Sequence, residues 1–357
     1  MDVGLALFWQ NYRGGRADVE VYRDELRLAH QAEDLGFDSI WTVEHHFTDY
    51  CVCPDPLQFL TYMAGRTTKL KLGTQVVILP WHDPIRVAEN VSVLDIYSEG
   101  RLILGIGRGL GRIEFEGFGV PMGDSRGRFQ ESAEILVSTL ETGKIAYDGE
   151  HFQIPERQLR PTPPYSFKDR FYSGAASPDS LRAVGELGLR LFVVPARGAE
   201  HVMNDIHLYR EAFRETQGTE PAPTACALWV YCDDDAERAQ ELGHRYLANY
   251  YELTLAHYEM TGEHFASTKG YENYARTSAA INRMGVDAAT EAFISLQAIG
   301  TPQQVYDKIV QVRGQLGFDT VTGVFNYGGM SGDDANNSMN LFAREVMPEL
   351  QKLPALA

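Results

Sequence analysis

Two adjacent histidines, His45 and His46, follow a short apolar run and stand beside Glu44. Imidazole gains or loses a proton near neutral pH, so a histidine can move protons for a reacting group. Neighbouring side chains of an extended chain point to opposite sides, so one ring can face a site while the other packs outward. Glu44 can orient either ring by a hydrogen bond. A histidine satisfied within the core is the competing interpretation for both.

A second candidate site is the turn Ser177-Pro178-Asp179-Ser180. Ser177 suits the N-cap of a helix, with proline at the first helical position. A helix N-terminus offers unpaired N–H groups and partial positive charge, which suit a phosphate, and two hydroxyls would add donors. Asp179 would have to point away from that anion. An ordinary capped helix explains the same residues.

Two arginines can supply further charge to such a site. Arg108 lies in the glycine-rich stretch 105–111, and Arg126 begins a later helical pattern. Arginine binds phosphate through paired hydrogen bonds. The glycine spacing does not match the dinucleotide-binding pattern GxGxxG. Surface ion pairs are the alternative for both arginines, and the candidate partners are Glu114, Glu116 and Asp124.

Composition narrows the class of protein. The 357 residues carry a formal net charge of -17, so the overall basic footprint of a nucleic-acid-binding protein is missing. We find no signal-peptide pattern and no membrane-spanning run, and we expect a cytoplasmic protein with reduced cysteines. Cys51 and Cys53 form a lone CxC close to the histidines. It lacks a second matched pair, so we expect no metal site.

These residues need a scaffold, and short apolar runs alternate with helical patterns along the chain. Eight such strands separated by helices favour parallel pairing, and eight is the number that closes a (β/α)8 (TIM) barrel. A doubly wound open sheet is the rival α/β fold. The predicted strands are Val3–Trp9, Ser39–Val43, Leu70–Leu79, Arg101–Gly105, Phe171–Ser173, Leu189–Val194, Thr224–Cys232 and Thr320–Phe325.

We expect residues 1–357 to form one barrel domain, with helices between most strands. The predicted helices are Val19–Leu35, Pro84–Tyr97, Arg126–Leu140, Ser177–Leu187, Glu200–Glu215, Asp234–Tyr251, Pro302–Leu316 and Asp334–Leu350. Two insertions interrupt the pattern. Gly143–Tyr165 is a hairpin or a loose excursion, and residues 260–297, between the seventh and eighth strands, form the largest. A long connection of this kind is a candidate active-site lid, a disordered segment or a solvated helical insertion.

The candidate residues follow strands, and barrel enzymes place their sites at the carboxyl ends of strands. Several stretches form a specific pattern along the chain: Trp41-x-x-Glu44-His45-His46-Phe47-Thr48, Gly73-Thr74-x-x-x-x-Leu79-Pro80, Asp83-Pro84-x-Arg86-x-Ala88-Glu89, Leu94-Asp95-x-x-Ser98-x-Gly100-Arg101, Gly105-Ile106-x-Arg108-Gly109-Leu110, Phe118-Gly119, Ser125-Arg126 and Gly300-Thr301-Pro302. In these stretches the chain resembles the bacterial luciferase-like flavin monooxygenases. The resemblance runs over nearly the whole chain and is strongest in the first 130 residues.

The resemblance implies an enzyme that receives reduced FMN from a separate NAD(P)H:flavin reductase. Reaction with O2 then gives a flavin C4a-(hydro)peroxide, which oxygenates a small, largely apolar organic substrate. By position, His45 matches the family's catalytic histidine, with Glu44 beside it. The residues matching the phosphate site are Arg108, Arg126, Ser177 and Ser180. Gln75–Val76 matches a non-proline cis peptide under the flavin ring, and Leu110 lies near that ring.

The chain departs from the family pattern at two positions. Gly107 replaces a reactive cysteine of the luciferase α subunit, which would leave the barrel mouth emptier and argues against a light-emitting enzyme. Ala176 replaces an acidic residue in the cofactor-binding turn. An F420-dependent oxidoreductase of the same fold and a non-catalytic flavin-binding relative are the alternative functions. Related proteins are often dimers, so we expect a homodimer that contacts neither nucleic acid nor membrane.

Overall fold

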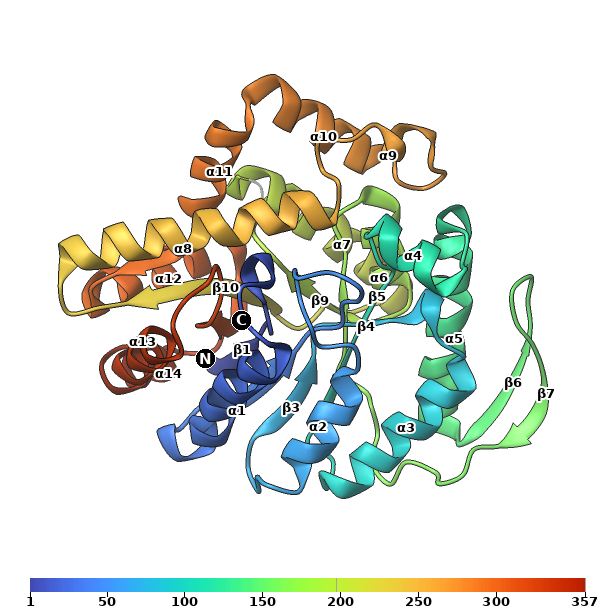
Figure 1. Ribbon diagram of the computed structural model, residues 1–357. Coiled ribbons are helices and arrows are strands. Elements are labelled where there is room, and N and C mark those ends of the chain that lie inside the picture. Colours follow the sequence, from blue (N-terminus) through green and yellow to red (C-terminus); the bar gives the residue numbers. More distant parts are fainter. Residues whose placement is uncertain (197, 357) are drawn as a thin grey trace.

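The computed structural model describes residues 1–196 and 198–356, and its centre is a closed ring of eight parallel strands (Figure 1). Around the ring the order is β1, β2, β3, β5, β8, β9, β10 and β12, and β12 pairs with β1. The predicted barrel is therefore confirmed, and the open sheet is excluded. The strand bounds are β1 Asp2–Leu7, β2 Ser39–Thr42, β3 Lys71–Thr74, β5 Leu102–Gly107, β8 Phe171–Gly174, β9 Arg190–Val193, β10 Thr224–Cys232 and β12 Phe318–Val324.

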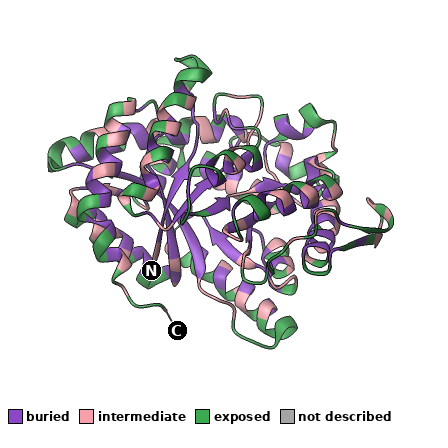
Figure 2. Cartoon of the chain, turned by 90° about the horizontal axis from the view of Figure 1, so that it is seen from below, coloured by how far each residue is buried: buried purple, intermediate pink, exposed green. Residues whose placement is uncertain are grey.

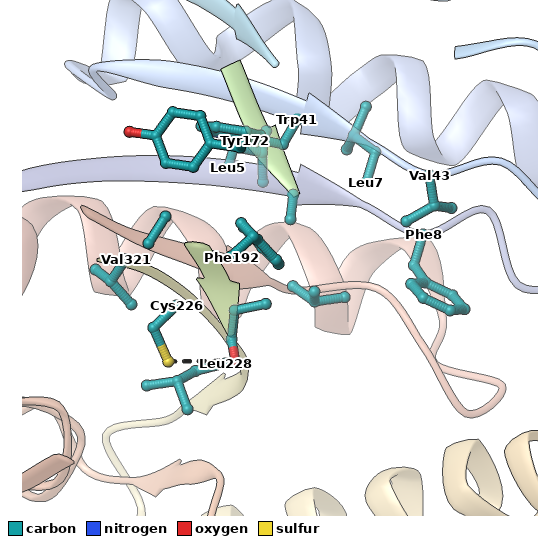
Figure 3. Packing of buried hydrophobic residues seen from close by; sticks show 14 of the residues in the cluster. Leu5, Leu7, Phe8, Trp41, Val43, Tyr172, Phe192, Cys226, Leu228 and Val321 are labelled. Atoms are coloured by element: carbon teal, nitrogen blue, oxygen red, sulfur yellow. Dashed lines mark hydrogen bonds between the residues drawn. The ribbon is translucent and has the colours of Figure 1, made fainter. Parts of the chain in front are cut away.

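Large side chains from opposite strands fill the ring. Trp41, Tyr172 and Phe192 meet there, with ring centroids of Trp41 and Tyr172 5.8 Å apart (Figure 3). A Cβ at Gly73 would lie 2.2 Å from the Trp41 indole, so this strand position must be glycine for the tryptophan to fit. The strands are almost wholly buried, whereas the helices expose their outer faces (Figure 2). Because side chains fill the centre of the barrel, a ligand can bind only at its mouth.

Helix boundaries follow local capping chemistry. α3, Pro84–Tyr97, begins where the Asp83 carboxylate accepts the N–H groups of Ile85 and Arg86. α1, Asp18–Leu35, ends at Gly36, whose φ of 91° favours glycine. The other helices around the ring are α5 Ser125–Thr142, α6 Pro178–Glu186, α7 Ala199–Gln217, α8 Ala236–His257, α12 Pro302–Leu316 and α13 Gly332–Glu345.

Several elements differ from the sequence predictions. The single run predicted for the third strand is divided into β3 and β4, Val77–Ile78, which pairs with β5. The predicted C-terminal helix is two helices, α13 and α14, Met347–Gln351. Two helices were not predicted at all, α2 Pro56–Ala64 and α4 Arg112–Phe118. Both are short and too irregular in pattern to stand out from loops.

The two predicted insertions have defined structures. The first contains an antiparallel hairpin, β6 Lys144–Asp148 and β7 Gln153–Gln158, which projects from the side of the barrel (Figure 1). The second lies between β10 and β12 and contains α9 His264–Ser267, α10 Glu272–Met284 and α11 Val286–Ile294. It leads into β11, Ala298–Gly300, which pairs with the outer part of β10. Among the described residues, no helix is long and apolar enough to cross a membrane.

Candidate functional site

A cavity of about 400 Å³ lies at the carboxyl ends of the barrel strands. Most strands contribute residues at or just after their carboxyl ends, such as His45 after β2, Val76 after β3 and Arg108 after β5. This volume is in the range of small-molecule and cofactor sites. Of the predicted site residues, those that line the cavity are Glu44, His45, Gln75, Val76, Arg108, Leu110, Ala176 and Ser180.

His45 is held by an acidic residue that the sequence did not associate with it. Its Nδ1 lies 3.0 Å from Oε1 of Glu114, and the His46 backbone N–H donates to the same oxygen at 2.9 Å. His257, near the end of α8, places Nε2 3.4 Å from this oxygen. We name His45, Glu114 and His257 the pocket cluster. Their donor atoms form the one group in the described chain that is close enough to hold a metal ion, and neither Cys51 nor Cys53 belongs to it.

Glu44 forms a separate group, the outer cluster, with His46 and His82. Its Oε1 accepts from His82 Nε2 at 2.6 Å and from His46 Nε2 at 3.2 Å, and Oε2 accepts the Ile78 N–H at 2.8 Å. Glu44 is thus bonded to the second histidine of the pair and not to His45. The His46 ring packs against Trp81 and Phe118. The prediction that the two histidines face opposite ways is confirmed.

Both carboxylates are buried yet remain charged. Burial by itself raises the pKa of Glu114, but the positive charge of His45 in its protonated form and hydrogen bonding from His257 and His45 lower it to about 2. Burial also opposes ionisation of Glu44, and hydrogen bonds from His46 and His82 hold its pKa below the ordinary value. Each glutamate is therefore a permanent acceptor at neutral pH.

The predicted phosphate residues gather at one part of the cavity rim. Ser177 is the N-cap of α6, but its hydroxyl donates to Ser180 Oγ at 2.9 Å and accepts no N–H from the first turn. Arg126 reaches the same helix, with a nitrogen 3.3 Å from an Asp179 oxygen. Asp179 therefore points toward Arg126, which is itself one of the predicted phosphate residues. Neither Arg126 nor Ser177 lines the cavity directly. Ser177 bonds to Ser180, which lines it, and Arg126 shares the Gly270 carbonyl with Arg108, which also lines it.

The insertion 260–297 covers this rim. The Gly270 carbonyl accepts hydrogen bonds from Arg108 at 2.8 Å and from Arg126 at 3.3 Å. The Arg108 guanidinium also lies 4.1 Å from the centre of the Tyr271 ring. Asn273 donates to the Ala176 carbonyl at 2.8 Å. The segment thus bonds directly to residues predicted to bind the cofactor.

The apolar part of the cavity has aromatic walls. Tyr251 and Phe293 stack with centroids 4.8 Å apart, and Trp229 and Tyr250 lie 4.6 Å apart. Phe8, directly after β1, also lines the cavity. Three other aromatic residues near strand ends lie elsewhere. Trp9 is buried against Thr42, while Trp81 and Phe47 pack around the outer cluster.

Two backbone features of the predicted site, the Gln75–Val76 peptide bond and Gly107, can be compared with the structure. The Gln75–Val76 peptide is cis, as the resemblance implied. At Gly107, a Cβ would lie 2.3 Å from a methyl group of Val76. The position is therefore closely packed, and the expectation of an emptier barrel mouth at Gly107 is wrong. A larger side chain there would require Val76 to shift.

Glu114, His257 and Tyr258 are the site residues that sequence reasoning missed. Glu114 was considered only as a surface partner for arginine, although its side chain is 1% exposed. Tyr258 lines the cavity and places its hydroxyl 3.4 Å from His45 Nε2. The last two lie more than 200 residues from His45, and no local pattern marks them.

The architecture defines a (β/α)8-barrel protein with a cofactor-sized cavity at the mouth, and the comparisons give its family. The sequence model "Luciferase-like monooxygenase" matches residues 1–320, and this chain belongs to that family. The alkanal monooxygenase alpha chain of Photorhabdus luminescens is 26% identical over 340 residues, which are 94% of this chain and 93% of that one.

Solved structures share the fold over almost the whole chain. The monooxygenase RslO1 from Streptomyces bottropensis superposes with a TM-score of 0.82 and 25% identity, covering 98% of this chain and 99% of that one. The oxygenating constituent of 3,6-diketocamphane monooxygenase from Pseudomonas putida, a type II Baeyer–Villiger enzyme in complex with FMN, gives 0.76 and 21%, covering 99% and 100%. At the latter identity the likeness concerns the fold alone.

Proposed function

We propose that this protein is a monooxygenase that uses reduced FMN and O2 to oxygenate a small, largely apolar organic compound. The observation that carries the proposal is that one cavity contains both kinds of surface that such an enzyme needs. Arg108, Ser180 and the α6 terminus offer positive charge and donors, while aromatic side chains and His45 line the remainder. FMN bound there would supply the oxygen chemistry. The protein would bind the cofactor, orient the substrate and exclude water.

The residues present fit the proposed cofactor. A Cβ at Gly174 would contact nothing within 4 Å, so the backbone before α6 is open to a ligand. The Ser177 hydroxyl does not cap the N-terminus of α6. The N–H groups of the first turn therefore remain available to a bound phosphate. Arg108 and Ser180 would bind the phosphate directly, and Arg126 and Ser177 would support them. Gln75, Val76, Leu110 and Ala176 would contact the rest of the cofactor.

The roles proposed for the chain's own groups follow from their positions. His45 is the proton-transferring group, because its Nε2 faces the cavity while Nδ1 is held by Glu114. Glu44 supports the cavity wall by holding His46 and His82. The segment 260–297 acts as a lid that shields the cavity from water, because Met260, Tyr274 and Ile281 line it. A separate NAD(P)H:flavin reductase would deliver the cofactor.

A homodimer is also part of the proposal. Helices α2 and α3 expose Tyr62, Ile96 and Tyr97, and the last of these is 60% exposed. Large exposed apolar side chains favour contact with another protein surface. The two helices follow the second and third strands of the barrel.

The test is an anaerobic titration of the purified chain with reduced FMN, oxidised FMN and reduced F420, followed by admission of O2. We expect reduced FMN to bind most tightly and to support product formation. Preference for F420 without O2 consumption would establish the oxidoreductase alternative, and binding without turnover would establish the non-catalytic one.

Arg108→Ala is the matching variant. It should weaken reduced-FMN binding about ten- to a hundredfold, the effect of losing a charged hydrogen bond. Arg112→Ala is the control, because Arg112 pairs with Glu259 on the surface outside the cavity. Equal affinity of the Arg108 variant and the wild type would remove Arg108 from the phosphate site.

A further inference from the structure

The pocket cluster fixes where the proton on His45 must lie. An ionised carboxylate only accepts hydrogen bonds. Oε1 of Glu114 lies 3.0 Å from His45 Nδ1, so Nδ1 must carry the proton in this contact. In the neutral ring, Nε2 is then an acceptor. The Tyr258 hydroxyl, 3.4 Å from Nε2, can donate to it. Burial holds the pKa of Tyr258 well above its ordinary value, so this hydroxyl keeps its proton.

His257 contacts the Glu114 carboxylate as well. Its Nδ1 lies 2.7 Å from the Thr48 hydroxyl, while its buried Nε2 lies 3.4 Å from Oε1 of Glu114. Burial lowers the pKa of His257 and so favours the neutral ring. If Thr48 donates to Nδ1, the proton of this neutral ring lies on Nε2 and points at the carboxylate. Both side chains are 1% exposed, so water does not screen the pair.

Close packing prevents the cluster from rearranging easily. The Tyr50 ring stacks on His257 at 4.6 Å and meets His45 edge-on at 4.9 Å. A Cβ at Gly111 would lie 2.5 Å from Glu114 Oε2 and 3.0 Å from His257 Nε2. Only glycine at position 111 allows the helix carrying Glu114 to approach His257 this closely. The geometry therefore selects one orientation for the His45 ring.

We propose that Glu114 and His257 are positioning residues that hold His45 as its Nδ1–H tautomer, with Nε2 presented to the cavity as the proton acceptor. This role rests on the proposed function of His45, but the tautomer itself does not. Glu114 acts on His45 directly, and His257 acts through Glu114. A cation held by the same three donors is the competing arrangement, and it requires His45 Nδ1 to be free of its proton.

The test is nitrogen NMR of the full-length chain with labelled histidine, without flavin. The His45 resonances are assigned from their loss in His45→Gln, and Nδ1 and Nε2 are distinguished by their couplings to ring protons. We expect wild-type His45 to be in the Nδ1–H form at neutral pH. Finding mainly the Nε2–H form in the wild type overturns the proposal without any variant that must fold.

Variants then show which residue determines the tautomer of His45. Glu114→Ala removes both acceptor oxygens and should turn His45 into a mixture of tautomers, with a smaller change in His257→Asn. His82→Asn is the matched control, because it alters a histidine on the other glutamate and should leave His45 unchanged. An unchanged tautomer in Glu114→Ala overturns the positioning role. The titratable groups that face His45 are Glu114, His257, Tyr50 and Tyr258.

Zinc addition tests the competing arrangement. If zinc at equimolar concentration shifts both His45 and His257 in the wild type but not in Glu114→Ala, the cluster is a metal site and the proposal is overturned. Unshifted resonances support it. Because these measurements need no flavin and no substrate, a protein that shows the expected tautomer but fails to bind FMN would sink the proposed function alone.

Discussion

The two histidine clusters have the same chemical composition and different surroundings. Each places one buried glutamate between two imidazoles, and the adjacent residues His45 and His46 belong to different clusters. In the outer cluster, Glu44 also accepts a backbone N–H of β4, so it ties the segment after β2 to the next strand. In the pocket cluster, one ring faces the cavity. Under the proposed function, one buried carboxylate stabilises structure, and the other holds the side chain that transfers the proton.

Neutralising the two glutamates should separate these roles most clearly. Glu44→Gln leaves three donors around an amide, and breaking a buried ionic contact costs about 3–5 kcal/mol in the free energy of unfolding. Glu114→Gln should instead lower kcat by about a hundredfold, the lower end of what an acid–base group contributes. Urea denaturation measures the loss of stability in Glu44→Gln, and the rate of oxygenated product formation at saturating substrate measures kcat in Glu114→Gln.

The comparison fails if the two variants lose stability and turnover in the same proportion. Hydrogen peroxide released per O2 provides the control for Glu114→Gln, because a poorly oriented His45 should release more of it while flavin affinity remains close to that of the wild type.

His82 of the outer cluster and His257 of the pocket cluster should change the free energy of unfolding with pH in opposite directions. Burial alone would lower the pKa of His82, but Glu44 raises it above the ordinary value, so its contribution is full below about pH 6.5 and is lost as pH rises through the folded pKa. Burial depresses the pKa of His257, so the folded state loses stability as pH falls below about 6.5. His82 is partly exposed, so its effect is the weaker one.

Replacing each histidine by asparagine tests this contrast. Thermal unfolding between pH 5.5 and 8 should show a flatter alkaline side for His82→Asn and a flatter acid side for His257→Asn. If both variants change the same side of the profile, the two clusters do not hold their histidines in opposite ways.

The barrel was predictable because its determinants are local. Apolar runs alternate with helical patterns, and single residues such as Gly36 and Asp83 end or begin helices by their own chemistry. The site face was predictable for a related reason, because parallel strands bring the residues after each strand to one end. Arg108, Ser180 and His45 reach the same cavity on that basis.

The partners of His45 could not be predicted in this way. Glu114 and Glu116 lie two residues apart on the same short helix, yet one is 1% and the other 65% exposed in its side chain. The sequence around them does not distinguish the two. His257 approaches Glu114 because the last part of α8 borders the cavity, and the length and direction of that helix are properties of the assembled fold.

The smallest expected effect concerns the cavity side of the pocket cluster. Tyr258 contacts His45 Nε2 at 3.4 Å, which is long for a hydrogen bond, so Tyr258→Phe should lower kcat only about two- to threefold. Tyr246→Phe in α8, the helix that ends just before Tyr258, is the control, because the Tyr246 hydroxyl bonds Asp334 outside the cavity. If Tyr258→Phe matched Glu114→Gln in size, the donor at Nε2 rather than the carboxylate at Nδ1 would determine the state of His45. The distinction between the two clusters would then depend on what faces the cavity, and not on which glutamate holds the ring.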